Sequence, residues 1–354
     1  MAISDTVRQT PFLLGQILDW PASLYPDRPA VEWEGGSLSF RGLLESVREK
    51  EAVLTSLGAR RFQRWGLLLT DIPDFLICFF ALLRLGCAVS PLREQSPVRP
   101  LREDLDLGGF QGLIISEEHY AYDELSANCR TSRLLKLAPG KVVIWLKEAG
   151  EPDSSDGCLV DVDPALILWS SGSTGRPRGV VLQHHAVLAN LWANVRALGY
   201  RDDDRTLLAL PLSHAYPLVH QCLCHLAIGA TVCIPPTPLV GPILSRAIED
   251  FSITTLTTVP PLLRILVEGV RRDKRPHSGL RLVTVGAGRA DPAIVQDFLR
   301  LLPLTQLVIT YGLTEAGPRV SSRGISRLPS GRLRARCASA CRRASVGVGL
   351  RTRR

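Results

Sequence analysis

The sequence predicts an α/β fold in which mostly parallel strands form sheets that are flanked by helices. Three observations lead to this prediction. Short apolar runs alternate with helix-like segments from about residue 160 to residue 311. These runs lack the polar alternation of a half-exposed sheet, which is typical of parallel strands covered on both faces. The chain of 354 residues is 45% hydrophobic and 21% charged, as expected of a globular protein with a sizeable core.

The first 150 residues are expected to mix strands and helices. The segment 38–58 predicts a short strand and an amphipathic helix closed by Gly58, and 75–86 predicts a buried helix. A polar, turn-rich segment at 151–157 predicts a subdomain boundary. The other strands expected in this part lie at 64–69, 112–117 and 141–146.

The second part predicts a more regular alternation. Proline near the start of several segments and glycine near their ends fit the rules of helix capping. The expected strands are 165–169, 206–210, 230–234, 253–259, 280–285 and 305–310, and the expected helices are 242–251, 261–270 and 292–302. We therefore expect one subdomain over 1–157, a second over 158–320 and a tail over 321–354.

The net charge of +8 comes from the tail. Residues 323–354 hold ten Arg and no Lys, Asp or Glu, so subtracting them from 42 basic residues leaves 32 against 34 acidic ones. The nearly neutral remainder does not predict specific nucleic-acid binding. The Arg-rich tail has no aromatic residue and no apolar period, which predicts disorder. It is either a native basic tail, able to tether a polyanion, or a truncated or frame-shifted end.

Nine cysteines without a regular spacing, and an N-terminus unlike a signal peptide, predict buried thiols and a cytoplasmic location. No transmembrane segment is expected, because Arg84 ends the apolar run 75–83 and three polar side chains interrupt 217–236. The close set from His220 to His225 could bind a metal, but its spacing favours core packing.

A glycine-rich turn, SSGSTGRPRG over 170–179, follows the predicted strand 165–169. Glycines let backbone N–H groups point at one concavity, while hydroxyls and arginine add donors and positive charge. The combination predicts a polyphosphate site, although the spacing is not that of a Walker A loop. The residues with these roles are Ser170, Ser171, Gly172, Ser173, Thr174, Gly175 and Arg178.

Three further motifs follow predicted strands, where ligands of open α/β sheets bind. In YGLTE (311–315), Tyr311 can stack on a base, Thr314 can donate to a phosphate and Glu315 can hold Mg²⁺. The small residues of VGAGR (285–289) permit close approach of a ligand, and LPLSHAY covers 210–216. Each of the first two could, by itself, be an ordinary exit from a strand.

Together these motifs resemble those of the adenylate-forming (AMP-binding) superfamily, which includes acyl-CoA synthetases, luciferases and the adenylation domains of peptide synthetases. The segment LLRLGCAVSPL (82–92) adds to the resemblance, which covers roughly residues 10 to 320. It implies the layered large N-terminal domain of these enzymes, with 1–157 as its N-terminal subdomain and 158–320 as its nucleotide-binding subdomain.

The resemblance also implies roles for residues. Thr174, Arg178, His214 and Glu315 would act in catalysis, with His214 at the acyl pocket and Glu315 holding Mg²⁺. The cofactors would be ATP and Mg²⁺, with coenzyme A or a carrier protein's phosphopantetheine as acyl acceptor. We expect the turn near 172 and the corner near 313 to form one ATP pocket. The residues implied in ATP binding are Ser170, Ser171, Gly172, Ser173, Thr174, Gly175, Arg178, Gly286, Ala287, Gly288, Tyr311, Gly312 and Thr314.

The sequence departs from the family pattern at several places. Arg178 stands where the phosphate loop usually has lysine, and no TGD-like segment follows YGLTE. The resemblance ends near residue 320, with no counterpart of the small C-terminal lid domain. We therefore expect ATP-dependent activation of a small carboxylic acid, impaired in this chain.

Because 211–220 has no acidic residue, an unaminated fatty or aryl acid is favoured over an amino acid. The alternatives are an inactive, regulatory nucleotide-binding protein and a fragment of an amino-acid adenylation domain.

Overall fold

The computed structural model describes residues 13–92, 109–119, 132–138, 142–147, 163–170, 178–237, 239, 241–273, 277, 279–327 and 333–339. The chain forms two compact units. Unit 1 comprises Met1–Trp20 and Arg41–Val187, and unit 2 comprises Pro21–Phe40 and Leu188–Arg354. Each unit contains a sheet with flanking helices, so the predicted α/β class is confirmed. The boundary between the units differs from the one expected at 157, because the two strands between 164 and 183 pair with the sheet of unit 1.

The sheet of unit 1 has seven strands in the order β6-β7-β5-β3-β4-β8-β9. Its centre, β5-β3-β4-β8, is parallel, whereas β7, β6 and β9 are antiparallel to their neighbours. The strands are β3 (Arg64–Leu68), β4 (Ala88–Pro91), β5 (Gly112–Ser116), β6 (Ser132–Ala138), β7 (Val142–Lys147), β8 (Pro164–Ser170) and β9 (Arg178–Gln183).

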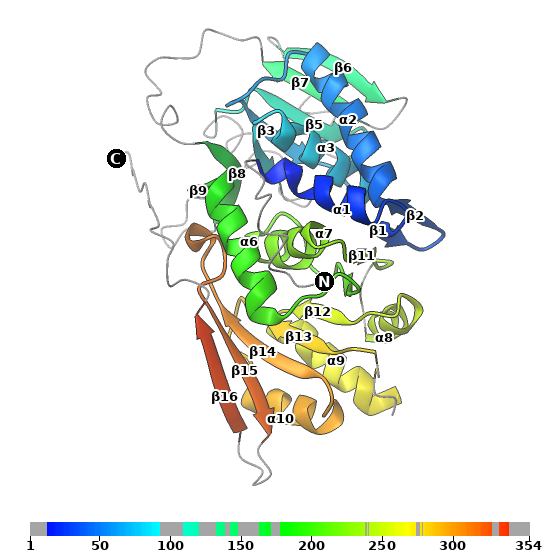
Figure 1. Cartoon of the computed structure of the whole chain (residues 1–354), viewed down its shortest axis with the longest axis vertical. Helices are drawn as coiled ribbons and strands as arrows, with labels where there is room; N and C mark the ends of the chain where they lie inside the picture. The colour runs from blue at the N-terminus through cyan, green and yellow to red at the C-terminus, as the bar shows by residue number, and fades with distance from the viewer. Residues whose placement is uncertain are drawn as a thin grey trace. The chain divides into compact units, whose positions relative to one another are not determined.

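The helices of unit 1 include α2 (Phe40–Ser56) and α3 (Ile72–Arg84), and the short η2 (Leu14–Leu18) lies against α3 (Figure 1). The carboxylate of Asp71 caps α3 by accepting from the backbone N–H of Asp74 at 2.9 Å. Eight side chains of α3 are buried, which confirms the helix predicted over 75–86 and its place in a core. The last turn of α3 presents Arg84, which pairs with Asp19 and Glu51.

The sheet of unit 2 has nine strands in the order β16-β15-β14-β13-β12-β10-β11-β1-β2. The strands from β14 to β1 are parallel, and each edge is completed by antiparallel strands. They are β1 (Pro29–Trp33), β2 (Gly36–Ser39), β10 (Arg205–Leu207), β11 (Thr231–Ile234), β12 (Thr255–Thr258), β13 (Leu282–Val285), β14 (Gln306–Tyr311), β15 (Ser321–Arg327) and β16 (Leu333–Ser339).

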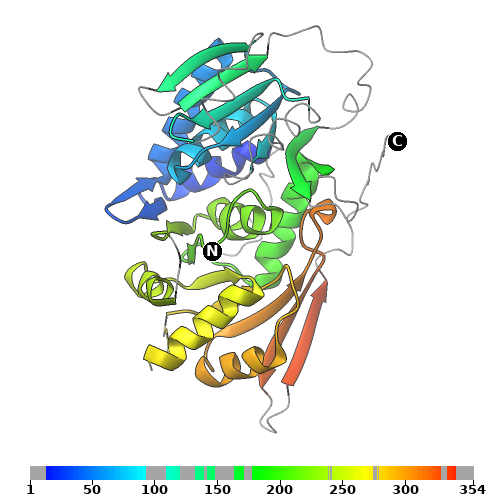
Figure 2. The same cartoon turned by 180° about the vertical axis from the view of Figure 1, so that it is seen from behind.

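Helices cover both faces of this sheet. Figures 1 and 2, drawn from opposite sides, show α9 (Pro260–Asp273) and α10 (Pro292–Leu301) on one face and α6 (His184–Leu198) on the other. The apolar stripes of α8 (Gly241–Asp250), α9 and α10 form one core with the strands, in which Leu266, Val283 and Phe298 are buried. The helices and strands predicted for this part of the chain are thereby confirmed.

The structure corrects the expectation of a disordered tail for part of 321–354. Strand β15 pairs with β14 from Leu307↔Ile325 to Tyr311↔Ser321, and β16 pairs with β15. Backbone hydrogen bonds to an existing edge need no apolar period, which is why composition did not reveal these strands. Residues 340–354 lie outside the described part of the chain.

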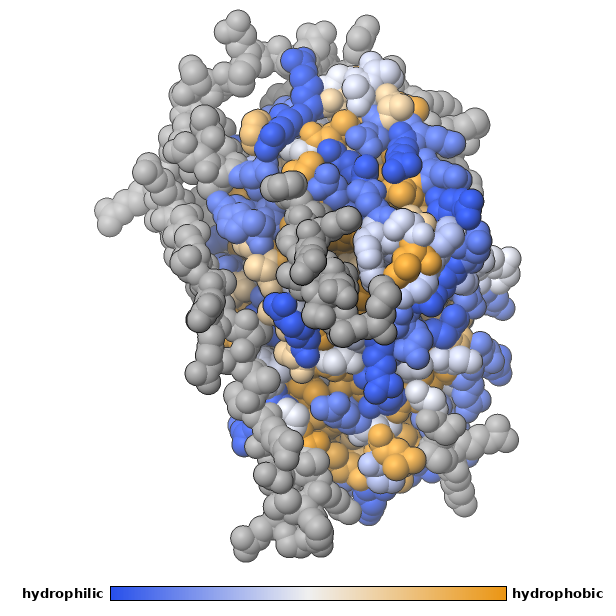
Figure 3. All heavy atoms as spheres, viewed as in Figure 1, coloured by the Kyte–Doolittle hydropathy of each residue, from blue (hydrophilic) through white to orange (hydrophobic). Residues whose placement is uncertain are grey.

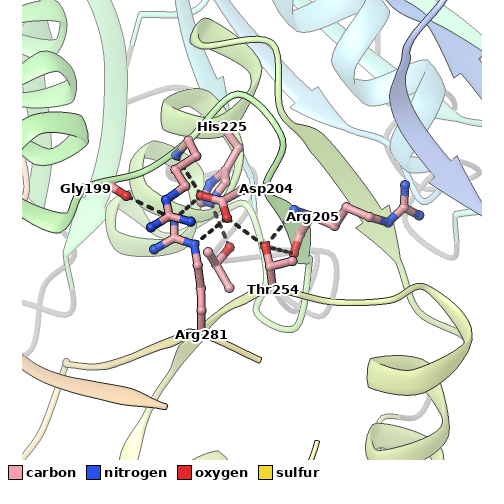
Figure 4. Close-up of polar contacts among 8 residues, drawn as sticks. Gly199, Asp204, Arg205, His225, Thr254 and Arg281 are labelled. Atoms are coloured by element: carbon pink, nitrogen blue, oxygen red, sulfur yellow. Dashed lines mark hydrogen bonds and ion pairs between the residues drawn. The ribbon is translucent and has the colours of Figure 1, made fainter. Parts of the chain in front are cut away.

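A buried ion pair joins the amino ends of three strands of unit 2 (Figure 4). The side chain of Asp204 is 1% exposed and accepts from both Nε and Nη2 of Arg281. It also accepts from the backbone N–H of Arg201 at 2.7 Å and from the hydroxyl of Thr254 at 2.8 Å. This full set of donors stabilises the carboxylate at the edge of the sheet opposite to the three strand-end motifs.

Cys78, Cys87, Cys222, Cys224 and Cys233 are free and buried, as predicted. Cys337 lies in β16, and Cys129, Cys158 and Cys341 lie outside the described residues. Burial raises the pKa of Cys78 to about 12, which keeps this thiol protonated. Within the described ranges, no helix is both long and apolar enough to span a membrane.

Exposed apolar side chains are scattered over the described surface. On the face drawn in Figure 3, hydrophilic residues predominate, and hydrophobic ones show over the region where α10 lies in Figure 1. Leu304, which follows α10, is 92% exposed. Single exposed leucines are ordinary in soluble folds and indicate no docking surface.

Candidate functional site

Three of the sequence motifs meet at one edge of the sheet of unit 2. Because β10, β12, β13 and β14 are parallel, their carboxyl ends lie together. LPLSHAY follows β10, while VGAGR and YGLTE begin at the last residues of β13 and β14. This is the edge at which ligands of open α/β sheets bind.

A chain of hydroxyl groups joins these motifs beneath the edge. The hydroxyl of Tyr216, from LPLSHAY, lies 3.2 Å from Oγ1 of Thr284 and 3.2 Å from Oγ1 of Thr310. Thr310 in turn bonds to the carbonyl oxygen of Val285 at 3.1 Å, and Thr284 reaches Oγ1 of Thr257 at 3.3 Å. Each hydroxyl can both donate and accept, so this network fixes the strand ends relative to Tyr216.

Gly286 lies directly above this network and leaves no room for a side chain. A Cβ atom there would overlap Oγ1 of Thr310 and lie 2.9 Å from Cζ of Tyr216. The next residue, Ala287, adopts the left-handed conformation at φ 58° and is exposed. A non-glycine residue in this conformation carries strain, which is common at ligand-binding turns.

The segment after β14 is a compact loop. The backbone N–H of Val320 donates to the carbonyl oxygen of Tyr311 at 2.9 Å, which closes the loop at its base. A Cβ atom at Gly312 would overlap the carbonyl oxygen of Pro318, so only glycine fits there. Asn190 of α6 holds the far side, because its Nδ2 donates to the carbonyl oxygen of Arg319 at 2.9 Å. The loop is thereby fixed to both the sheet and α6.

The loop presents the predicted ligand-binding side chains to solvent. Tyr311 is 60% exposed, and Glu315, in the 3-10 turn η4 (Thr314–Ala316), is exposed as well. Thr314 is half-buried beside it. A flat aromatic ring, a hydroxyl and a carboxylate on one exposed loop can meet the base, phosphates and metal of a nucleotide.

The glycine-rich turn belongs to unit 1. Ser170 ends β8 and Arg178 begins β9, and these two residues are register partners in an antiparallel pair. Arg178 is exposed. The predicted phosphate-binding residues Ser171, Gly172, Ser173, Thr174 and Gly175 lie outside the described residues. Their role, and the expectation of one pocket formed by both segments, therefore stay predictions.

Two histidines near the motifs differ in their surroundings. His214 is exposed in the turn after β10, at the start of a helical segment in which Leu218 N–H donates to its carbonyl oxygen. His184 is buried, and its Nδ1 accepts from the backbone N–H of Leu14 at 2.9 Å. Burial lowers the pKa of His184 to about 4, so this ring is a neutral structural acceptor.

The set from His220 to His225 is part of the core. His225 bonds through Nε2 to Oγ1 of Thr255 at 2.9 Å, and its ring packs on Tyr200. Among the residues that the structure describes, no group of three or more His, Cys, Asp or Glu could hold a metal ion.

Sequence reasoning missed several residues of this edge: Asn190, Thr284, Thr310 and Arg319. The two threonines lie inside strands and resemble ordinary strand residues, so their convergence depends on strand order. For these missed residues the sequence offered one signal, at Arg319. This arginine stands four residues after Glu315 and directly before an apolar valine.

The chain matches the family model described as AMP-binding enzyme over residues 18–347. The chain belongs to this family. The convergence of the three motifs of unit 2 at one sheet edge is consistent with the match.

Relatives and solved structures agree with the assignment. Feruloyl-CoA synthase of Amycolatopsis sp is 31% identical over 85% of this chain and 60% of its own length. The 4-coumarate–CoA ligase 1 of Oryza sativa subsp. japonica is 28% identical over 81% of this chain and 54% of its length. The chain thus spans somewhat more than half the length of these relatives.

Among solved structures, the N-terminal subdomain of Klebsiella oxytoca NpsA, in complex with 3-hydroxybenzoyl-AMSN, has a TM-score of 0.70 and 25% identity. The match covers 89% of this chain and 76% of that one. VinN, in complex with L-aspartate, has a TM-score of 0.72 at 21% identity, covering 88% and 78%, which shows the same fold.

The described residues fit the implied metal ion. Glu315 supplies one exposed carboxylate, and Mg²⁺ is commonly bound by one or two carboxylates together with substrate phosphates and water. A dedicated cage of several acids is therefore not required.

Proposed function

We propose that this protein activates an unaminated carboxylic acid with ATP. A carboxylate oxygen attacks the α-phosphorus, the bond to the β-phosphate breaks, and acyl adenylate and pyrophosphate form. A thiol of coenzyme A or of a carrier protein then attacks the acyl carbon and releases AMP. The observation that carries this proposal is the family match together with three motifs at one sheet edge.

The main barrier to this reaction is the repulsion between two anions, the carboxylate and the triphosphate. Residues of the chain would reduce this repulsion. We assign phosphate binding to the hydroxyls and amides of 170–175 and to Arg178, whose charge would attract the triphosphate. Thr314 would add a hydroxyl, and Tyr311 would stack on the adenine ring. Bound Mg²⁺, held by Glu315, would supply positive charge to the phosphates.

The acid is proposed to be aryl or fatty. The names of the relatives refer to 4-coumarate, ferulate and indoleacetate, and residues 211–220 supply no carboxylate for an amino group. His214, which is exposed in the turn after β10, would line the entry for the acyl group. We also propose that the 354-residue chain acts slowly by itself, because it covers only 54% of the length of the 4-coumarate–CoA ligase 1 of Oryza sativa subsp. japonica.

Two measurements test the function. We expect the chain to bind ATP in titration calorimetry and to catalyse slow ATP–pyrophosphate exchange with 4-coumarate, ferulate or a medium-chain fatty acid. Thr174→Ala and Glu315→Gln should each lower the exchange rate by about 10²–10³-fold, since each removes a group that stabilises developing charge.

Arg264→Ala is the matched control, because this half-exposed arginine of α9 pairs with Asp291 on the surface. It should leave both measurements unchanged. ATP binding without exchange for any acid would favour the inactive, regulatory nucleotide-binding protein. Absence of ATP binding by the folded chain would refute both functions.

A further inference from the structure

Arg319 is a buried cation without a counter-ion in the described part of the chain. It is 2% exposed, and none of its Nε, Nη1 and Nη2 atoms has a hydrogen-bond acceptor among the described residues. Its backbone is fixed, since its carbonyl oxygen accepts from Nδ2 of Asn190. The guanidinium group is therefore buried next to a fixed backbone, and the described residues leave its hydrogen-bonding capacity unused.

The same unit shows how a structural arginine is satisfied. Arg281 donates through Nε and Nη2 to Asp204, and through Nη2 to the carbonyl oxygen of Gly199 at 3.0 Å (Figure 4). A buried charge without a partner is strongly unfavourable, so an arginine kept at such a place calls for an anion that arrives from elsewhere.

The described groups on which the charge of Arg319 acts include no carboxylate. They are Tyr200, His220 and Cys224. His220 is 0% exposed, and both of its ring nitrogens lack a partner among the described residues. Burial first, and the charge of Arg319 second, hold the pKa of His220 well below its usual range. The ring is neutral and offers one N–H donor.

This pair lies next to the strand-end motifs. The ring of His220 lies 5.2 Å from that of Tyr216, whose hydroxyl reaches Thr310 beneath Gly286. Arg319 follows the YGLTE loop in sequence. His220 belongs to η3 (Pro217–Leu223), a π-helix, and such wide turns are rare and frequent at functional sites. Tyr216 thus connects the motif edge with His220.

We propose that Arg319 and His220 bind a second carboxylate on the acid substrate, at the end remote from the carboxylate that reacts with ATP. This inference rests on the proposed function and narrows it to acids with two carboxylates. The planar guanidinium group matches a carboxylate through two parallel N–H···O bonds, and the imidazole N–H provides a third donor. A substrate without a second carboxylate would leave the buried charge of Arg319 uncompensated.

Matched pairs of acids test this inference on the full 354-residue chain. Adipate is compared with hexanoate, and terephthalate with 4-methylbenzoate, by ATP–pyrophosphate exchange and by the melting-temperature shift that each acid causes in the presence of ATP. We expect at least one dicarboxylate to be preferred by about tenfold or more, because a site built for a polar group strongly rejects analogues that lack it.

Arg319→Met should abolish that preference. Without ligand it should also melt at a higher temperature than the parent chain, because it removes an unpaired buried charge. The control Arg264→Met should keep the preference. Equal use of both members of each pair, or a preference that survives Arg319→Met, would overturn the inference, as would a lower melting temperature of the unliganded Arg319→Met chain.

The two proposals can fail separately. A folded chain that binds ATP and activates only monocarboxylic acids refutes the second carboxylate site and supports the proposed function. A folded chain that neither binds ATP nor responds to any acid refutes both.

Discussion

Two arginines of unit 2 illustrate how the surroundings of a residue decide its role. Arg281 has a carboxylate and a carbonyl oxygen as acceptors at the amino ends of the strands, whereas Arg319 has none among the described residues. Side-chain type is identical, so the difference comes from the partners that the fold supplies. The first arginine stabilises the sheet, and we assign the second to substrate recognition.

Replacing Asp204 tests the structural pair. Asp204→Asn keeps a side chain of similar size but leaves Arg281 without its counter-ion, and we expect a loss of about 3 kcal/mol in the free energy of unfolding. This is the lower end for a broken buried pair, because the side chain of Arg281 remains 23% exposed. Chemical denaturation measures the loss.

Asp297→Asn is the control for that substitution. Asp297 pairs with Arg271 and Arg300, whose side chains are both more than half exposed, so the change should cost about 1 kcal/mol or less. Equal losses for the two variants would contradict the structural role of Asp204.

At the scale of elements, the loop from Gly312 to Val320 joins β14, β15 and α6. Its base is closed by Val320 N–H on Tyr311, and its far side is held by Asn190. The loop fixes Tyr311 and Glu315 at one end and Arg319 at the other. Its conformation therefore bears on both proposed ligand contacts.

Gly312→Ala tests this loop. The added Cβ would overlap the carbonyl oxygen of Pro318, a backbone atom that can move only with the loop. We expect weaker ATP binding, by about tenfold or more, and a lower melting temperature. Gly241→Ala is the control, since a Cβ there meets only ordinary van der Waals neighbours and the residue lies in α8. Unchanged ATP affinity in Gly312→Ala would show that the loop does not position the nucleotide.

At the scale of the whole molecule, burial holds histidines of both units in their neutral form, among them His184 of unit 1 and His220 and His225 of unit 2. The pKa of His184 in unit 1 and of His225 in unit 2 is lowered to about 4, in each case chiefly by burial. The unfolded chain binds these protons near pH 6.5, so it takes up more protons than the native chain between pH 6.5 and 4. Acid therefore destabilises both units.

We expect the free energy of unfolding to be constant above about pH 7 and to fall on acidification to pH 5, by about 2 kcal/mol for each histidine. Protonation of Asp204 adds to the loss of unfolding free energy at lower pH. Burial alone would raise its pKa, but the hydrogen bonds from Arg281 and from the backbone of Arg201 outweigh this and lower it. Its contribution is present above about pH 4 and is lost as the pH falls through its lowered pKa.

Denaturation at pH 7 and at pH 5 measures this dependence. His225→Gln should reduce the difference between the two values by about 2 kcal/mol, because the glutamine cannot take up a proton when the chain unfolds. Unfolding that is as costly at pH 5 as at pH 7 would contradict the assignment of neutral, buried histidines.

The amino-acid sequence by itself determined the α/β class, most helices and central strands, and the family, because apolar periodicity and glycine-rich motifs are local properties of the chain. It also identified Tyr311, Glu315 and VGAGR as candidate ligand-binding residues. Only the tertiary structure decided which strands are neighbours, and so brought Tyr216, Thr284 and Thr310 together beneath Gly286. The strands β15 and β16 and the isolation of the Arg319 charge could not be predicted, since pairing at a sheet edge and the lack of a counter-ion depend on residues distant in the chain.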